Sequence, residues 1–307
     1  MSPVPIARAV SLLLVVSLLA LAAVASAARD AAPAPNLAAI SLAASDLGGA
    51  KVTTQRFIKP TKPATAAYAR AFAEGTRLGS ARLLVLETET SLFATPSVAA
   101  KQVQEFRRYL GTRKGREAFG AAIAAGFGKE AKEDLKRIAV STPVSLGAGQ
   151  SSVHVVATFV LKDNASFSVH LALVQTDRAL ALLGFSPMPG SKLTRSHLRQ
   201  LGRLQGDRFL KGFTVASTAA PAISGTASPA QTLTASSGDW SGSPSSYTYQ
   251  WSRCDTTVTT CTDIAGATAA TYTVAPEDTG FVLRTTVTGR NSVTSASTAS
   301  PVTAAVG

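Results

Sequence analysis

The apolar positions of residues 37–215 change their spacing several times along the chain. Spacings of three and four residues, typical of helices, occur over residues 37–47, 96–111, 119–128 and 194–211. Alternating or continuous apolar runs, typical of strands, occur over residues 52–58, 66–72, 81–93, 152–161, 166–175 and 178–186. The mixed charges of residues 129–137 indicate a solvated helical turn. The order helix, strands, helices, strands, helix predicts an α+β domain, with helices packed on an antiparallel sheet.

The helix expected over residues 96–111 has the clearest start and end. Thr95 is a good N-cap residue, and Pro96 suits the first helical turn, where its missing N–H is not needed. Gly111 ends the helix. We expect one face of this helix to be buried; it carries Ala99, Val103, Phe106 and Leu110.

Residues 221–307 follow a different pattern, with short strand-like segments about every ten residues. These segments are residues 222–226, 232–236, 247–254, 262–264, 271–274, 281–288 and 295–302. Gly, Pro, Ser and Asp separate them, which is typical of an all-β immunoglobulin-like sandwich. Trp251 lies in the middle of one segment, with Tyr247 and Tyr249 at the same parity. We therefore expect this aromatic face to enter the core.

The two ends of the α+β region set the domain boundaries. Residues 1–27 have the pattern of a secretory signal peptide, with Arg8, an apolar run and a closing Ala-Ser-Ala. The alternative is an uncleaved anchor, but the run has about 15 residues where a spanning helix needs about 20. We expect a tether at residues 28–36, the α+β domain at 37–215, a small-residue linker at 216–220 and the sandwich at 221–307. No transmembrane segment is expected in the mature chain.

The charge of the chain is concentrated in its first domain. Residues 29–215 have 26 Lys and Arg against 13 Asp and Glu, a net charge of +13, whereas residues 216–307 have 3 against 5, a net of −2. A field of this sign attracts anionic partners, although the charge also serves solubility.

Four cations gather on one face of the helix expected over residues 194–211. They are Lys192, Arg195, Arg199 and Arg203, and we call them the basic face. Like charges at i,i+4 repel by a few tenths of a kcal/mol per pair, so a compensating anion is expected. That anion is either a ligand or a carboxylate of this chain such as Glu130, Glu133 or Asp134. No aromatic residues interleave with the basic face, which argues against the stacking of single-stranded nucleic acid. No specific nucleic acid is expected as a partner.

Cys254 and Cys261 are the two cysteines of the chain. An even count in an exported protein favours a disulfide between them. A metal site would need more soft ligands than two.

Five segments of the second domain carry a resemblance to a known module. They are PAISGTA (residues 221–227), LTASSGDW (233–240), YQWSRCD (249–255), CTDIAGAT (261–268) and LRTTVTGRN (283–291). This region resembles the Ig-like module of exported actinobacterial proteins, which implies a rigid surface or spacer module without catalytic residues. The element order of the first domain is loosely similar to PsbP-like α+β folds.

Two of the three histidines lie on the strands of a hairpin whose turn is expected at residues 163–165. This register places His154 and His170 on one face, about 13 Å apart, which is too far for a shared metal ion. A turn one residue shorter would place them on opposite faces. Both alternatives predict half-exposed structural histidines.

Glu87 and Glu89 are the best pair of candidate catalytic carboxylates. On a strand their side chains point the same way about 7 Å apart, a separation found in inverting glycosidases. The same alternation places Leu84, Leu86 and Leu92 on a buried face. We therefore expect the two carboxylates to face water.

These features indicate an exported, non-catalytic binding or surface protein of the bacterial cell envelope, extracellular or at the cell surface. Its basic domain would engage an anionic envelope polymer, a lipid surface or a small apolar ligand, and the Ig-like module would present it. A secreted hydrolase and a purely structural or adhesive protein are the alternatives. Nucleophile elbows, zinc-protease motifs and glycine-rich phosphate loops are absent from the sequence, so no catalytic, cofactor or metal residue is assigned.

Overall fold

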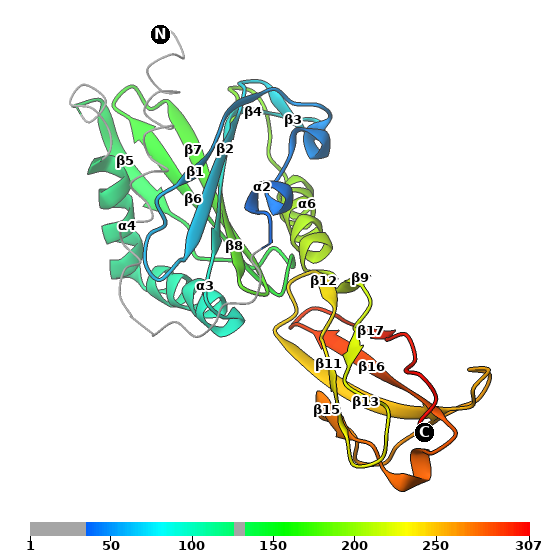
Figure 1. Cartoon of the computed structure of the whole chain (residues 1–307). Coiled ribbons are helices and arrows are strands. Elements are labelled where there is room, and N and C mark those ends of the chain that lie inside the picture. The colour runs from blue at the N-terminus through cyan, green and yellow to red at the C-terminus, as the bar shows by residue number, and fades with distance from the viewer. Residues whose placement is uncertain (1–34, 126–132) are drawn as a thin grey trace. The chain divides into compact units, whose positions relative to one another are not determined.

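The structure is a computed structural model that describes residues 35–125 and 133–307 (Figure 1). The chain divides into two compact units, residues 36–211 and residues 212–307. Both are built mainly from antiparallel sheets, and the helices longer than one turn begin in the first. The expected signal peptide lies outside the described residues. Within the described part, no helix is both long and apolar enough to cross a bilayer.

One antiparallel sheet forms the centre of the first unit. Its strands have the order β1-β2-β4-β8-β7-β6-β5, and β3 pairs with β4. The strands are β1 (Val52–Ile58), β2 (Ala66–Phe72), β3 (Thr76–Leu78), β4 (Ala81–Leu92), β5 (Leu135–Val140), β6 (Ser151–Leu161), β7 (Ser166–Thr176) and β8 (Ala179–Pro187). Neighbours in the β8-β7-β6 run follow one another in sequence, so short turns connect them.

Helices cover both faces of this sheet (Figure 1). They are α2 (Leu37–Ile40), the 3-10 turn η2 (Ala44–Leu47), α3 (Pro96–Gly111), α4 (Arg113–Ala125) and α6 (Arg195–Phe213). On one face, Phe106 of α3 and Phe119 of α4 share a core with Val153, Val155 and Leu171 of the strands. Successive strand residues point to opposite faces. Because helices cover both faces, the odd and the even positions of the central strands are both buried.

The predicted helix α3 has the expected cap, and its stripe is buried. The side chain of Thr95 accepts a hydrogen bond from the Val98 amide at 3.3 Å. The buried positions of the stripe are Ala99, Val103, Phe106 and Leu110. Thr112 then ends the helix in extended backbone.

Two segments of the first unit form a structure other than the expected one. Residues 37–47 form two separate turns, α2 and η2, because Ser41 between them is extended and its hydroxyl binds the Leu37 carbonyl. Residues 135–140 form the strand β5 and not a solvated helical turn, because Leu135, Ile138 and Val140 turn toward the core while β5 pairs with β6. The first half of that predicted turn lies outside the described residues.

The β6–β7 hairpin has a register two residues away from the expected one. Val160 pairs with Ser166, and the Leu161 amide donates to the Ala165 carbonyl at 2.9 Å. The connecting loop is therefore residues 162–164, with Asn164 in the left-handed region at φ 67°. This is the usual geometry of a three-residue hairpin loop, and it moves every cross-strand pair.

The second unit contains two antiparallel sheets and a two-stranded ribbon. The first sheet has the order β10-β11-β15, the second β14-β13-β16-β17, and the ribbon pairs β12 with β9. The strands are β9 (Ala216–Ala219), β10 (Ile223–Ser224), β11 (Thr232–Ala235), β12 (Asp239–Ser241), β13 (Ser246–Cys254), β14 (Cys261–Asp263), β15 (Thr271–Thr273), β16 (Val282–Arg290) and β17 (Ser295–Ala299). Both sheets contribute to one core around Trp251, which includes Leu233 and Leu283.

The linker expected at residues 216–220 is instead a strand. Its small residues indicated a linker, but Ser217 of β9 pairs with Trp240 of β12. The residues just before β9 are also held within this unit, because the Asn291 amide donates to the carbonyls of Phe213 and Gly242 at 2.6 Å each. The second unit therefore begins before the expected linker.

The expected disulfide between Cys254 and Cys261 is present. It joins β13 to β14 at a direct cross-strand pair. Within the loop that it closes, Asp255 accepts hydrogen bonds from the Thr257 hydroxyl and from the amides of Thr257, Thr259 and Thr260, and these hydrogen bonds, led by that of the hydroxyl, lower the pKa of its carboxyl to about 2. The loop therefore has a fixed backbone conformation.

Candidate anion-binding site

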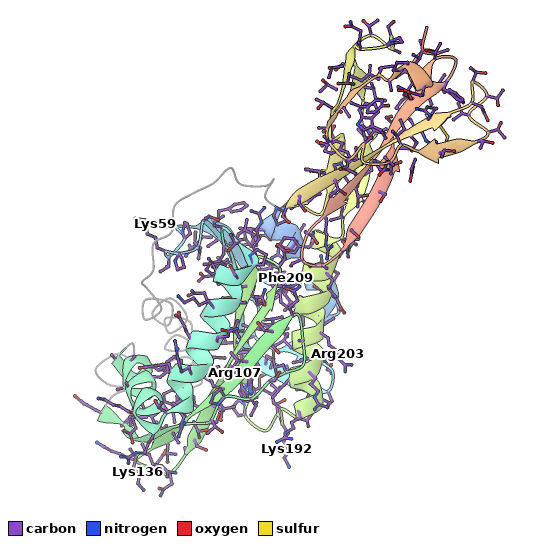
Figure 2. The ribbon with its side chains drawn as sticks, turned by 90° about the horizontal axis from the view of Figure 1, so that it is seen from below. Lys59, Arg107, Lys136, Lys192, Arg203 and Phe209 are labelled. Carbon is purple, nitrogen blue, oxygen red and sulfur yellow. A yellow bond between two sulfur atoms is a disulfide. The ribbon has the colours of Figure 1, made fainter. Side chains whose placement is uncertain are left out.

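The basic face lies along the outer side of α6 and the segment before it. Arg195, Arg199 and Arg203 are exposed helical residues, whereas Lys192 is exposed but precedes the helix. Thr194 stands at the N-terminus of α6 and accepts a hydrogen bond from the His197 amide at 3.4 Å. The helix therefore starts one residue later than the expected residue 194, and Lys192, which precedes both starts, belongs to the segment before the helix. Figure 2 shows Lys192 and Arg203 with side chains directed outward.

The four cations have no carboxylate partner among the described residues. The ion pairs of the first unit involve other cations, as in Arg208 with Asp46 at 2.9 Å and three exposed pairs on α3 and α4. The compensation considered from Glu133 and Asp134 is therefore not made, and Glu130 lies outside the described residues. Among the described residues, no ion pair neutralises the positive charge of the basic face, which is exposed to solvent.

A glycine pair on α6 determines what lies beside the basic face. A Cβ atom at Gly202 would lie 3.0 Å from the Ala148 side chain, and one at Gly206 would lie 3.1 Å from the Gly149 amide nitrogen. Both distances are tighter than ordinary van der Waals contact. The two glycines therefore allow residues 146–149 to lie directly against the helix.

A cleft of about 120 Å³ lies where this segment meets the first turns of α6. Its lining consists of Val144, Ser145, Leu146, His154, Arg195, Leu198 and Arg199. Two members of the basic face thus share a cleft with a histidine of β6. The volume is enough for several water molecules or a small anionic group.

His154 belongs to a buried histidine pair. Its Nε2 lies 3.1 Å from Nδ1 of His170, the two rings stack, and Phe185 stacks on both. Only 3% of His154 and 9% of His170 are exposed. Burial lowers the pKa of each imidazole to about 4, and His154 adds repulsion that lowers the pKa of His170. Both rings are neutral at pH 7.

The expected separation of the two histidines was wrong, and so was their expected half-exposure. His154 pairs with Ala172 and His170 with Val156, so the actual register makes the two histidines diagonal neighbours on one face. In the described part of the chain, no group of three or more His, Cys, Asp or Glu is placed to hold a metal ion. His154 lines the cleft. His170 contacts it from behind, through the 3.1 Å nitrogen contact and the stacked rings.

The chemistry of the cleft favours binding an anion. Each guanidinium offers several N–H donors in a planar fork that suits phosphate or carboxylate oxygens. His154 adds a neutral ring edge, whose role as donor or acceptor depends on the tautomer. Val144 and Leu198 add apolar side chains to the wall.

The carboxylates Glu87 and Glu89 do not face open water as expected. Both are half-buried, because α3 and α4 cover their face of the sheet. Burial raises the pKa of Glu89, and a hydrogen bond from Ser91 offsets part of that rise. Glu89 belongs to a separate cavity, described below.

One contact that could suggest catalysis lies on α6 and was missed in the sequence. Ser80 Oγ lies 3.1 Å from Nε2 of His197, but Nδ1 of that ring accepts the Thr194 amide at 3.3 Å. The ring proton then sits on Nε2 and points at Ser80. An imidazole in this tautomer does not remove a proton from the hydroxyl, so the contact does not form a nucleophile.

Comparisons with known proteins provide little further information. No protein-family model and no curated protein matches the chain. Among solved structures, the crystal structure of domains A168–A170 from titin matches 82% of this chain and 99% of its own, at 10% sequence identity and a TM-score of 0.23. An overlap at this score supports no conclusion about fold or function.

Proposed function

We propose that the protein is an exported, non-catalytic binding protein of the cell envelope. Its first domain binds an anionic group at the basic face and the adjoining cleft. Its second domain is an Ig-like module that presents the first. The proposed ligand is a phosphate-bearing envelope polymer, because a row of arginines along a helix suits repeated anionic groups better than a single small ion.

The observation that carries this proposal is the meeting of Arg195 and Arg199 with His154 in one cleft. Arginines on a solvated face alone need no ligand. Here the two guanidiniums have no anionic partner among the described residues, and they border a partly apolar hollow with a buried polar ring. That arrangement has the convergent polar groups typical of binding sites.

Two further features support export and the Ig-like assignment. The pattern of residues 1–27 and the disulfide Cys254–Cys261 both suit an oxidising compartment. In the second unit, Trp251 is completely buried, and its indole N–H donates to the Ala269 carbonyl at 3.0 Å. A central tryptophan between two packed sheets is a feature of immunoglobulin domains.

The proposal is tested by measuring the affinity of the mature chain for long-chain inorganic polyphosphate at increasing salt. We expect the affinity to fall steeply, because exposed charges are screened over about 8 Å at physiological ionic strength. Reversing three charges, with Arg195→Glu, Arg199→Glu and Arg203→Glu, should weaken binding by roughly tenfold or more at low salt. Unfolding should change little, because the buried side of α6 is untouched.

A matched control reverses three other cations away from the cleft, so that the net charge changes by the same amount as in the first triple variant. Arg56, Lys59 and Lys114 are exposed, and their reversal to glutamate should reduce affinity much less. If both triple variants lose affinity equally, binding reflects net charge and not this site. If the unaltered chain does not bind at low salt, the proposal fails.

A further inference from the structure

A second cavity lies on the opposite face of the sheet, beneath α3. Its volume is about 50 Å³. Phenylalanine and leucine side chains form most of the apolar wall, among them Phe106, Phe119, Leu171 and Leu173, and the polar part includes Lys62, Glu89 and Ser91. Leu171 and Leu173 alternate with His170 on β7, so this cavity and the anion-binding cleft lie on different faces of one sheet.

Glu89 is the acidic group of this wall. Within residues 35–125 and 133–307, its carboxyl accepts one hydrogen bond, from Ser91 Oγ to Oε1 at 3.3 Å. No cation lies within ion-pair distance of it among the described residues, although Lys62 lines the same cavity. A carboxylate has about four positions for accepting hydrogen bonds, so most of the capacity of Glu89 is unused by the described chain.

The surroundings of Glu89 indicate which ligand would complement it. Burial among phenylalanine and leucine side chains disfavours the charged carboxylate and raises its pKa. A cation placed beside the carboxyl reverses that effect, because opposite charges within about 4 to 6 Å favour ionisation. An anionic ligand would be repelled, and a purely apolar ligand would leave the carboxyl without a partner.

We propose that this cavity is a second binding site, which accepts the end of a small alkyl or aryl amine. The ammonium group lies against Glu89 and the carbon chain lies between Phe106, Phe119 and Leu173. This site is independent of the proposed anion-binding function, because it uses other residues on the other face of the sheet.

Binding of three four-carbon probes to the mature chain tests the proposal: n-butylamine, n-butanol and butyrate. NMR titration of the backbone amides at pH 7.5 gives the affinities. We expect butylamine to bind at least about tenfold more tightly than butanol, and butyrate not to bind, since an ion pair is stronger in a partly apolar site than in water. Shifts should concentrate at Glu89 and Phe119.

Three variants locate the ammonium group and the carbon chain. Glu89→Gln should remove the preference for butylamine over butanol while keeping butanol affinity within twofold. Glu87→Gln is the matched control, because Glu87 lies on the same strand outside the cavity wall, and it should leave the preference unchanged. Ala64→Met should fill the cavity and abolish binding of both probes.

The pH dependence gives a separate readout of the carboxyl. Affinity for butylamine should rise as pH rises through the pKa of Glu89, because only the ionised carboxylate pairs with the ammonium, and the Glu89→Gln variant should lose this rise. Equal binding of butylamine and butanol, an unchanged preference in Glu89→Gln, or no binding of any probe would overturn the proposal. None of these results affects the polyphosphate measurement.

Discussion

The buried imidazoles of His154 and His170 link the stability of the first unit to pH. Their pKa of about 4 in the folded chain lies below the value of about 6.5 in an unfolded chain. The unfolded state therefore takes up more protons between pH 6.5 and 4. The contribution of these two histidines to the free energy of unfolding is therefore fully present above pH 6.5. It is lost as pH falls from 6.5 to 4.

We predict that the first unit loses about 2 kcal/mol per histidine between pH 7 and pH 5. Urea unfolding at both pH values measures this loss. His154→Gln with His170→Gln should flatten the profile, because glutamine does not titrate in this range. An unchanged slope in the double variant would assign the pH dependence to other groups.

At the scale of the element, the approach of residues 146–149 to α6 depends on a glycine. Gly202→Val would place its Cβ 3.0 Å from the Ala148 side chain. We predict a destabilisation of about 1 to 3 kcal/mol from overpacking. Weaker polyphosphate binding should accompany it, because the segment would move away from Arg195 and Arg199.

The matched control for this prediction is Gly111→Ala in α3. A Cβ atom at Gly111 meets nothing within 4 Å, and alanine favours a helix by up to about 1 kcal/mol. Chemical denaturation gives the free energy of unfolding of both variants, and we expect only Gly202→Val to be destabilised. Gly202→Val with unchanged stability and unchanged affinity would show that the close approach does not hold the cleft together.

Elements with strong local signals were predictable from the sequence. The Thr95 cap, Pro96 and the apolar stripe placed α3 correctly, and the run of residues 52–58 is the strand β1. The basic face was found because arginine spacing depends only on the helix period. Contacts between segments far apart in the sequence could not be predicted in this way, because no local pattern encodes them.

The cleft could not be predicted, because its lining comes from three segments far apart in the sequence: residues 144–146, His154 of β6 and the first turns of α6. The contact between His154 and His170 was missed because the three-residue loop was expected one position too late, at residues 163–165, whereas it is residues 162–164, with Asn164 in the left-handed region. Shifting the loop by one position moves every cross-strand pair by two residues, so the expected register separated His154 from His170. The glycines at positions 202 and 206 were the missed signal for a close approach to α6.

At the scale of the whole molecule, the second unit includes residues that looked like a linker. A fragment of residues 212–307 keeps the Phe213 carbonyl that Asn291 binds and the strand β9. We predict that this fragment unfolds cooperatively on its own. A fragment of residues 221–307 should be less stable by about 1 to 3 kcal/mol, because the buried Asn291 amide loses an acceptor.

Thermal unfolding of the two fragments, followed by circular dichroism, makes this comparison. Equal stability would mean that β9 adds nothing to the second unit. A broad, non-cooperative transition for residues 212–307 would mean that this unit does not fold by itself.

The central claim is that anions bind at one place, where Arg195 and Arg199 border the cleft beside His154. Its most direct test follows the arginine Nε–H signals of the mature chain by NMR while pyrophosphate is added. The account predicts saturable shifts at Arg195, Arg199 and the His154 ring, with little change at the exposed Arg56. Shifts spread evenly over all exposed arginines, or no shift at Arg195 and Arg199, would contradict it.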